Sequence, residues 1–262
     1  MITRPAGRST EILVFTRNLI STLSLVIDVK DSVARAIEAL RTGHPVLVYD
    51  ADGREEETDI VVASQFVTPD IVRFLRKEAG GLICTTVPPE ARERIGLPFL
   101  SELFGEAAPR HPVLARTLAT TAAYDPIASP FSITINHRDT RTGITDRDRA
   151  KTIARFSSLV GEAIRQENGW GLEALGREFR SPGHVPLLNA SDGLLSRRRG
   201  HTELSTALVT MAGLIPSATI CEMMGDDGRA RSKEDAKEYA EARNLVFLEG
   251  LDVVEAWQLW SG

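Results

Sequence analysis

The fold is decided by the apolar run Pro45-Val46-Leu47-Val48-Tyr49, the charged run Asp50-Ala51-Asp52-Gly53-Arg54-Glu55-Glu56-Glu57-Thr58-Asp59 and the apolar run Ile60-Val61-Val62-Ala63. Each apolar run has the length and composition of a buried strand. The ten residues between them carry six carboxylates and one arginine. Carboxylates crowded on a rigid scaffold repel one another, which favours binding of a cation or retention of a proton. The alternative is a solvated acidic turn, for which Asp52-Gly53 is a suitable pair.

The composition is that of an ordinary soluble globular protein, with 262 residues of which 42% are hydrophobic and 26% charged. A net charge of -5 and the absence of a basic tail argue against nucleic acid as the main partner. Cys84 and Cys221 are too few for a disulfide framework, which fits a reducing cytoplasm. No apolar run approaches the roughly 20 residues that a membrane span needs, so we expect no membrane insertion.

Helical and strand patterns alternate along the chain. Asp31 is the expected N-cap of a first helix that ends at Gly43, and Thr68-Pro69 starts a second helix that Gly80-Gly81 ends. Thr145 and Ser232 are the expected caps of two more helices, and another helix begins near His201. The expected strands cover residues 45–49, 60–64, 82–87, 131–136, 185–189, 217–222 and 245–248.

This alternation predicts a layered sheet with helices packed on it, in one domain from about residue 29 to residue 262. Residues 101–130 contain four prolines and are expected to be mostly loop. Residues 1–28 match no motif and are interpreted as an N-terminal extension of uncertain status, which we expect to be dispensable.

A second informative segment, Ser196-Arg197-Arg198-Arg199-Gly200-His201-Thr202-Glu203, leads into an apolar-periodic helix. A helix N-terminus has free backbone N–H groups and a partial positive charge, and arginine with glycine makes it a suitable phosphate cradle. The alternative is a basic loop before a capped helix. Histidine is a metal ligand type, so a basic loop, His201 and an acidic loop on one scaffold together suggest a phosphorylated, oxygen-rich substrate.

Two further residues are candidates for proton transfer. His184 lies in a segment shaped by proline and glycine, and Glu222 ends an apolar run, where partial desolvation would raise its pKa toward a useful range. The alternative for Glu222 is a strand end that faces water. Cys84 is better explained as a small buried residue than as a nucleophile. The sequence has no Ser/His/Asp triad motif, no Walker loop and no paired CxxC motif.

Taken together, the segments resemble 3,4-dihydroxy-2-butanone 4-phosphate synthase, a lyase of riboflavin biosynthesis, in its archaeal, monofunctional branch. They occur in the family's order over roughly residues 31–262. The matching segments are 50–59, 80–84, 131–135 with 142–145, 180–185, 198–203 and 220–224 with 226–228.

The resemblance implies conversion of D-ribulose 5-phosphate to L-3,4-dihydroxybutan-2-one 4-phosphate and formate, with Mg²⁺ or Mn²⁺. It also implies an α+β fold, a single layered domain with a mixed β-sheet flanked by helices, and a homodimer with active sites at the subunit interface. The alternatives are another metal-dependent sugar-phosphate isomerase or aldolase, and a non-catalytic sugar-phosphate-binding regulatory protein. A Schiff-base aldolase would need a buried lysine, and the lysines of this chain are expected on helix surfaces.

By motif match, the resemblance makes Glu55 and His201 the metal ligands. It makes His184, Glu222 and Asp59 the residues of catalysis. The substrate-binding residues that it implies are Arg54, Glu55, Asp59, Arg198, Arg199, Gly200, His201, Thr202 and Glu222, with residues 198–202 at the phosphate end. Arg199 departs from the family pattern, in which that position is glycine or a neutral residue.

Overall fold

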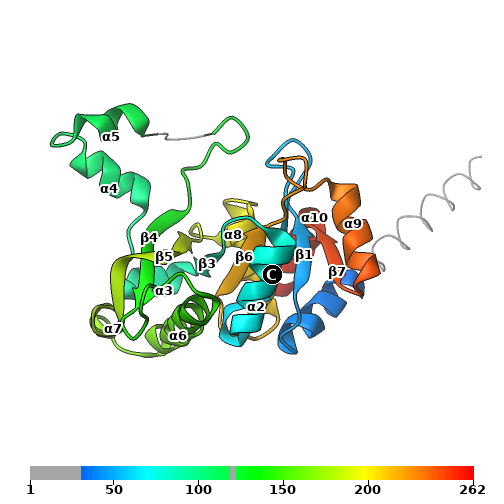
Figure 1. Cartoon of the computed structure of the whole chain (residues 1–262), viewed down its shortest axis with the longest axis horizontal. Coiled ribbons are helices and arrows are strands. Elements are labelled where there is room, and N and C mark those ends of the chain that lie inside the picture. The colour runs from blue at the N-terminus through cyan, green and yellow to red at the C-terminus, as the bar shows by residue number, and fades with distance from the viewer. Residues whose placement is uncertain (1–30, 119–121) are drawn as a thin grey trace, which may run out of the picture.

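The computed structural model describes residues 31–118 and 122–262, so the predicted extension over residues 1–28 lies outside the described residues. One sheet is formed by β1 (Val46–Tyr49), β2 (Thr58–Ala63), β3 (Cys84–Val87), β4 (Phe131–His137), β5 (Phe179–Asn189), β6 (Ala218–Glu222) and β7 (Val246–Glu249). The strand order is β4-β5-β3-β6-β2-β1-β7 (Figure 1). β1 runs parallel to β7 and β3 runs parallel to β5, while the other neighbours are antiparallel.

Helices cover both faces of the sheet and enclose two apolar cores. One core packs under α2 (Pro69–Phe74), α3 (Pro89–Ile95), α6 (Asp146–Arg165), α7 (Trp170–Glu178) and α9 (Lys233–Ala242). The other packs under the helix over residues 31–41, α8 (His201–Met211) and α10 (Gly250–Ser261). The predicted α+β fold with a mixed sheet flanked by helices is therefore confirmed. No helix within the described residues is both long and apolar enough to cross a membrane.

Local sequence signals explain several element ends. Thr68, Thr145 and Ser232 are N-caps whose side chains accept hydrogen bonds from backbone N–H groups three residues on, as predicted. Gly43 and Gly80 adopt the left-handed conformation that ends a helix. The prediction that Asp31 is an N-cap is wrong, because residue 31 is already helical.

Other expectations from the sequence are wrong in extent. Residues 101–130 were expected to be mostly loop, yet this stretch also contains α4 (Leu100–Ala107) and α5 (Pro112–Thr117). Pro112 does not prevent α5, because it stands at a first helical position, where it needs no backbone N–H partner. β5 begins at Phe179 rather than at residue 185, because the segment 179–180 pairs with the end of β4 beyond a bulge. The patterns also missed α3, α7 and α10.

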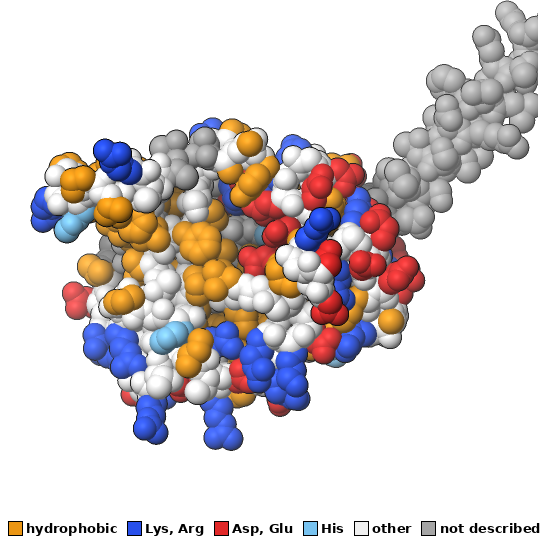
Figure 2. Space-filling model, turned by 45° about the horizontal axis from the view of Figure 1, so that its top comes forward, with side chains coloured by type: hydrophobic (Ala, Val, Ile, Leu, Met, Phe, Trp, Pro, Cys, Tyr) orange, Lys and Arg blue, Asp and Glu red, His pale blue; other side chains and the backbone are white. Residues whose placement is uncertain are grey.

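The helices α4 and α5 form an arm that projects from the rest of the molecule (Figure 1). Neither helix contains a buried residue, although Phe104 and Val113 are large and apolar. Figure 2 shows hydrophobic side chains gathered on the face beside this arm. An amphipathic pair of helices without a covered face is unusual in a monomer.

The sheet brings three motif segments together at the same end of its strands. The acidic loop joins the end of β1 to the start of β2, and β6 runs antiparallel to β2 so that it ends where β2 begins. α8 packs against β1, β2, β3 and β6 on one face. Its N-terminus therefore meets the acidic loop, and Glu222 meets Asp59.

Substitution of Phe156 on α6 tests the core that packs under α2, α3, α6, α7 and α9. Its ring is fully buried and packs edge-on against Phe179, with ring centroids 5.9 Å apart. Phe156→Ala should lower the free energy of unfolding by about 3–5 kcal/mol, measured by urea denaturation. Lys151→Ala, on the exposed side of the same helix, should change it little. Equal effects of the two substitutions would contradict the assigned core.

Candidate functional site

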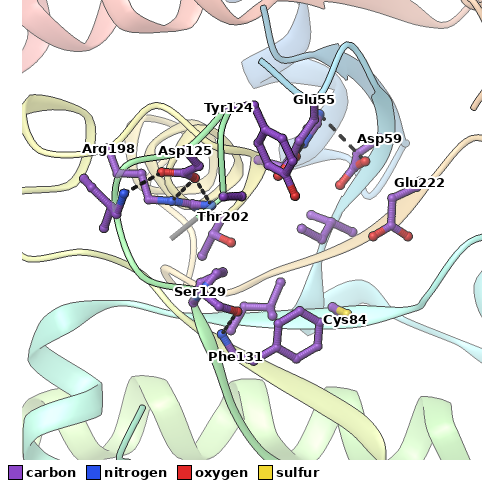
Figure 3. A pocket seen from close by; sticks show the side chains of 16 residues that line it. Glu55, Asp59, Cys84, Tyr124, Asp125, Ser129, Phe131, Arg198, Thr202 and Glu222 are labelled. Carbon is purple, nitrogen blue, oxygen red and sulfur yellow. Dashed lines mark hydrogen bonds and ion pairs between the residues drawn. The ribbon is translucent and has the colours of Figure 1, made fainter. Parts of the chain in front are cut away.

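A cavity of about 300 Å³ opens where the three motif segments meet. Its acidic end is formed by Asp59 and Glu222, while Asp125, Arg198 and Thr202 lie at the opposite end, with Cys84 and Phe131 below them (Figure 3). The remaining lining residues are Glu55, Ala122, Tyr124, Ile127, Ser129, Pro130, Leu188, His201 and Ile220. The volume is at the small end of ligand sites, which suits a compact metabolite.

Asp50 fixes the shape of the acidic loop. Its buried carboxylate accepts hydrogen bonds from the backbone N–H groups of Glu55 and Glu57, at 2.9 and 3.1 Å. The Arg54 guanidinium donates to the same carboxylate at 2.9 Å. A buried carboxylate with this many donors is fully engaged, so its part is to hold the loop that presents Arg54 and Glu55.

His201, at the first position of α8, joins that loop to the helix. Its Nδ1 lies 3.2 Å from Glu55 Oε2, and its Nε2 lies 3.2 Å from the Glu57 carbonyl oxygen and 3.7 Å from Asp59 Oδ1. The imidazole is 6% exposed, so these contacts take place largely out of water. Glu57 is a contact that sequence patterns did not single out, because its backbone oxygen rather than its side chain faces the histidine.

The charges in this corner shift one another's protonation. Burial, reinforced by the negative charge of Glu222 and opposed by His201, raises the pKa of Asp59 to about 7. Burial would lower the pKa of His201, but the charges of Asp59 and Glu55 outweigh it and raise the pKa to about 9. Burial would raise the pKa of Glu55, but His201 and Arg54 lower it to about 2. Of these three groups, Asp59 is the one whose pKa lies nearest neutral pH.

The same corner suits a divalent cation. Ligand atoms of Asp50, Glu55 and His201 lie within 4.8 Å of one another. Asp50 is held by two backbone N–H groups, so Glu55 and His201 are the residues that would hold a metal. Their contact with each other at 3.2 Å would then give way to bonds to the metal. Asp59 Oδ1 is buried and has no hydrogen-bond partner, as expected where a cation or its water would complete the contacts. One carboxylate and one imidazole, with waters and substrate oxygens, fit Mg²⁺ or Mn²⁺.

Strand register explains why Asp59 and Glu222 lie together. They are directly opposed residues of the antiparallel pair β2 and β6, so their side chains lie on one face. Like charges in that position repel, and the charge of Glu222 is one cause of the raised pKa of Asp59. The backbone N–H of Leu82 donates to Glu222 Oε2 at 2.7 Å and orients the carboxylate.

Gly81 makes this approach possible. Its N–H donates to the Glu222 carbonyl oxygen at 3.0 Å, and a Cβ at residue 81 would lie 2.4 Å from Glu222 Oε2. A side chain at this position would displace the carboxylate. The glycine pair that ends the second helix therefore also positions Glu222.

The opposite end of the cavity is built on two arginines. Arg198 donates through Nη1 to Glu203 Oε2 at 2.7 Å and through Nε to Asp125 Oδ2 at 2.8 Å. Arg54 Nη2 donates to the same Asp125 oxygen at 2.7 Å. Glu203 is fully buried and also accepts from the N–H of Ser191 at 2.9 Å, so it anchors the Arg198 guanidinium from behind.

Gly200 is required between these arginines. A Cβ there would lie 2.4 Å from Arg198 Nη1 and 2.7 Å from Arg54 Nη2. Thr202, in the first turn of α8, is buried and lines the cavity beside Arg198. This arrangement of two guanidiniums, a hydroxyl and a helix N-terminus is suited to an anion such as a phosphate.

Six of the predicted site residues line this cavity, Arg54 and Gly200 contact residues that line it, and two predicted residues lie apart from it. Those brought together are Arg54, Glu55, Asp59, Arg198, Gly200, His201, Thr202 and Glu222. His184 is exposed on β5 and contacts Asn136, with its Nδ1 3.1 Å from Asn136 Nδ2, and it does not line the cavity. Arg199 is exposed and also lies outside the lining.

Sequence patterns missed Asp125 and the role of Glu203. Asp125 lies in a segment without helical or strand periodicity, so nothing in its spacing marked it. Glu203 stood in the basic motif, and the available signal was an acidic residue five positions after Arg198. Cys84 is buried, which raises the pKa of its thiol well above the usual value, and it therefore fits the predicted structural part.

Comparison with known proteins agrees with this geometry. A family model described as 3,4-dihydroxy-2-butanone 4-phosphate synthase matches residues 34–256. The chain is 47% identical over 235 residues to the protein of that name from Methanosarcina mazei, covering 88% of this chain and 93% of the relative. It is 43% identical to the protein of that name from Archaeoglobus fulgidus, covering 89% and 95%.

Solved structures give the same result. The Candida albicans 3,4-dihydroxy-2-butanone 4-phosphate synthase matches with a TM-score of 0.62 at 29% identity, over 85% of this chain and 95% of that one. A second synthase structure, in complex with two magnesium ions, matches with a TM-score of 0.62 at 26% identity, over 84% and 93%. The chain belongs to the 3,4-dihydroxy-2-butanone 4-phosphate synthase family, whose enzymes serve riboflavin biosynthesis.

Proposed function

We propose that this enzyme converts D-ribulose 5-phosphate to L-3,4-dihydroxybutan-2-one 4-phosphate and formate in the cytoplasm, through a catalytic domain that spans residues 29–262. The observation that carries this proposal is one small cavity with a metal-suited, proton-exchanging end and a phosphate-suited end. The two ends match the two ends of the substrate, a carbonyl with adjacent hydroxyls and a phosphate. The alternatives have less support, since the compared relatives carry the synthase name.

Each end has a defined part in the chemistry. A divalent cation, Mg²⁺ or Mn²⁺, held by Glu55 and His201 would supply a Lewis acid for adjacent sugar oxygens. Enolisation beside the ketone needs a base, and Glu222 and Asp59 stand together at that end of the cavity. Arg198 and Thr202 hold the phosphate, which changes little in charge during the reaction. No lysine is found among the described residues that line the cavity, which disfavours a Schiff-base aldolase.

We also propose a homodimer in which His184 of the partner subunit completes each site. His184 is exposed and lies outside its own chain's cavity. The arm of α4 and α5, with Phe104 and Val113 uncovered, offers apolar surface for a second copy. A twofold dimer would give both cavities the same missing histidine.

Formate release tests the reaction itself. Incubation of the full-length protein with ribulose 5-phosphate and Mg²⁺ should release one formate per substrate consumed, and EDTA should abolish the release. His201→Ala should weaken Mg²⁺ binding measured by calorimetry, because it removes the only nitrogen donor of the proposed pair. Absence of formate, or formate release that EDTA leaves unchanged, would contradict the proposal.

Substitutions of Glu222 and Arg198 should change different kinetic constants. Glu222→Gln keeps shape and the Leu82 hydrogen bond but accepts no proton, so kcat should fall by roughly 10²–10⁴-fold with little change in KM. Arg198→Lys keeps the charge opposite Glu203 but loses the fork of donors, so KM should rise roughly tenfold with little change in kcat.

The control for these two variants is Glu173→Gln on the exposed surface of α7, which should match the wild type in both constants. A Glu222→Gln enzyme with normal kcat and weakened substrate affinity would make Glu222 a binding residue. Proton transfer would then pass to Asp59.

Mixed dimers test the part of His184. His184→Ala and Glu222→Gln proteins should each be nearly inactive alone. After unfolding and refolding together, half of the dimers carry one of each chain, and each of those holds one site without either substitution. About a quarter of wild-type activity should return. No recovery in a mixture shown to contain mixed dimers would place His184 and Glu222 in the same chain's site. Full activity of the His184→Ala protein alone would place His184 outside catalysis.

A further inference from the structure

The cradle between Arg54 and Arg198 is already filled by a carboxylate of the chain itself. One oxygen of Asp125 accepts from Arg54 Nη2 at 2.7 Å and contacts Arg198 Nη2 at 2.7 Å and Nε at 2.8 Å. Arg198 is also paired with Glu203, and Arg54 with Asp50 and Glu55, while the Asp125 oxygen bridges the two largely buried guanidiniums. Figure 3 shows the Asp125 carboxylate beside the Arg198 guanidinium, joined to it by dashed lines, and both residues line the cavity.

Asp125 and Glu203 both pair with Arg198, but they differ in how they are held. Glu203 lies on α8, fully buried, and does not line the cavity. Asp125 lines the cavity and stands on an irregular segment, where a two-residue bridge to Ala122 and a hydrogen bond from the N–H of Ile127 are its local ties. Asp125 can therefore leave Arg198 at the expense of few contacts, whereas Glu203 cannot leave without disrupting α8.

The charge and geometry of the Asp125 oxygen are those of a phosphate oxygen. A carboxylate oxygen shared by two guanidiniums makes the same charge-assisted hydrogen bonds that a phosphate oxygen would make there. The N–H groups that face the cavity, Nη2 of Arg54 with Nη2 and Nε of Arg198, already donate to Asp125. A phosphate placed on these N–H groups would stand against the Asp125 carboxylate and be repelled by it in a site with little water. A phosphate that binds between Arg54 and Arg198 must displace Asp125.

We propose that Asp125 is a built-in competitor that holds the phosphate position of the empty enzyme and withdraws when the substrate's phosphate binds. The choice of phosphate as the displacing anion rests on the proposed function. Asp125 then lowers the apparent affinity for phosphate by the fraction of molecules in which it occupies the cradle. It also bridges the two guanidiniums while no substrate is bound.

Binding of inorganic phosphate to the full-length protein, measured by calorimetry, tests this proposal. Asp125→Asn keeps the acceptor for the Ile127 N–H but removes the charge that fills the cradle. Its dissociation constant for phosphate should be lower than that of the wild type by roughly tenfold, the scale of a charged hydrogen bond no longer broken on binding.

Two control variants separate displacement from a general change of charge. Glu203→Gln also removes a negative charge beside Arg198, but Glu203 is not displaced, so phosphate binding should stay unchanged or weaken. Asp192→Asn removes a carboxylate from an exposed ion pair with Arg92 outside the cavity and should leave binding unchanged. The melting temperature of each variant shows whether it is folded.

The proposal is overturned if Asp125→Asn binds phosphate no more tightly than the wild type, since Asp125 would then be a permanent partner that orients the arginines. Equal gains in Asp125→Asn and Glu203→Gln would also overturn it, because charge alone would explain both. If neither the wild type nor Asp125→Asn bound phosphate, the assignment of a phosphate site between Arg54 and Arg198 would be rejected. None of these measurements involves turnover, so they are independent of the formate assay. If formate release failed but Asp125→Asn bound phosphate more tightly, the synthase reaction would be rejected and the proposed role of Asp125 would stand.

Discussion

The pairing of buried charge is the constraint on which the rest of this structure depends. Arg198, Asp59, His201 and Glu203 are each less than a tenth exposed, and a buried charge without a partner would cost several kcal/mol. Their partners come from distant parts of the chain, since the acidic loop, the start of α8 and the segment around residue 125 have to meet. The sheet order makes this possible, because it places β1, β2 and β6 side by side.

One network therefore serves both folding and chemistry. The ties of Asp50 to the backbone at Glu55 and Glu57 fix where the Glu55 carboxylate stands. The register of β2 against β6 fixes where Asp59 and Glu222 stand. Each functional group is thus held by a contact that the fold makes anyway, which is how a site keeps its geometry without ordering costs at the moment of binding.

Much of this was accessible from the sequence. Strands β1, β2 and β6 are short apolar runs with clear ends, and Thr145 and Ser232 cap their helices through a local hydrogen bond, so local patterns identify them. The two charged motifs revealed the two ends of the cavity for the same reason: each is contiguous in the chain.

What remained hidden depends on contacts between residues that are distant in sequence. Asp125 gains its importance only because the fold brings it to two arginines 71 and 73 residues away in sequence. The helices α4 and α5 lack buried residues, so no apolar face against this chain's core marked them in the sequence. His184 matched a family motif, but a motif does not say whether a side chain serves its own cavity.

Gly81 carries a consequence for how this enzyme can vary. It has no functional group, yet its missing side chain leaves the space into which the Glu222 carboxylate extends. Any replacement with a Cβ forces either the backbone or the acid to move. Space alone therefore restricts residue 81 to glycine. Even Gly81→Ala should be selected against as strongly as the loss of the Glu222 carboxylate.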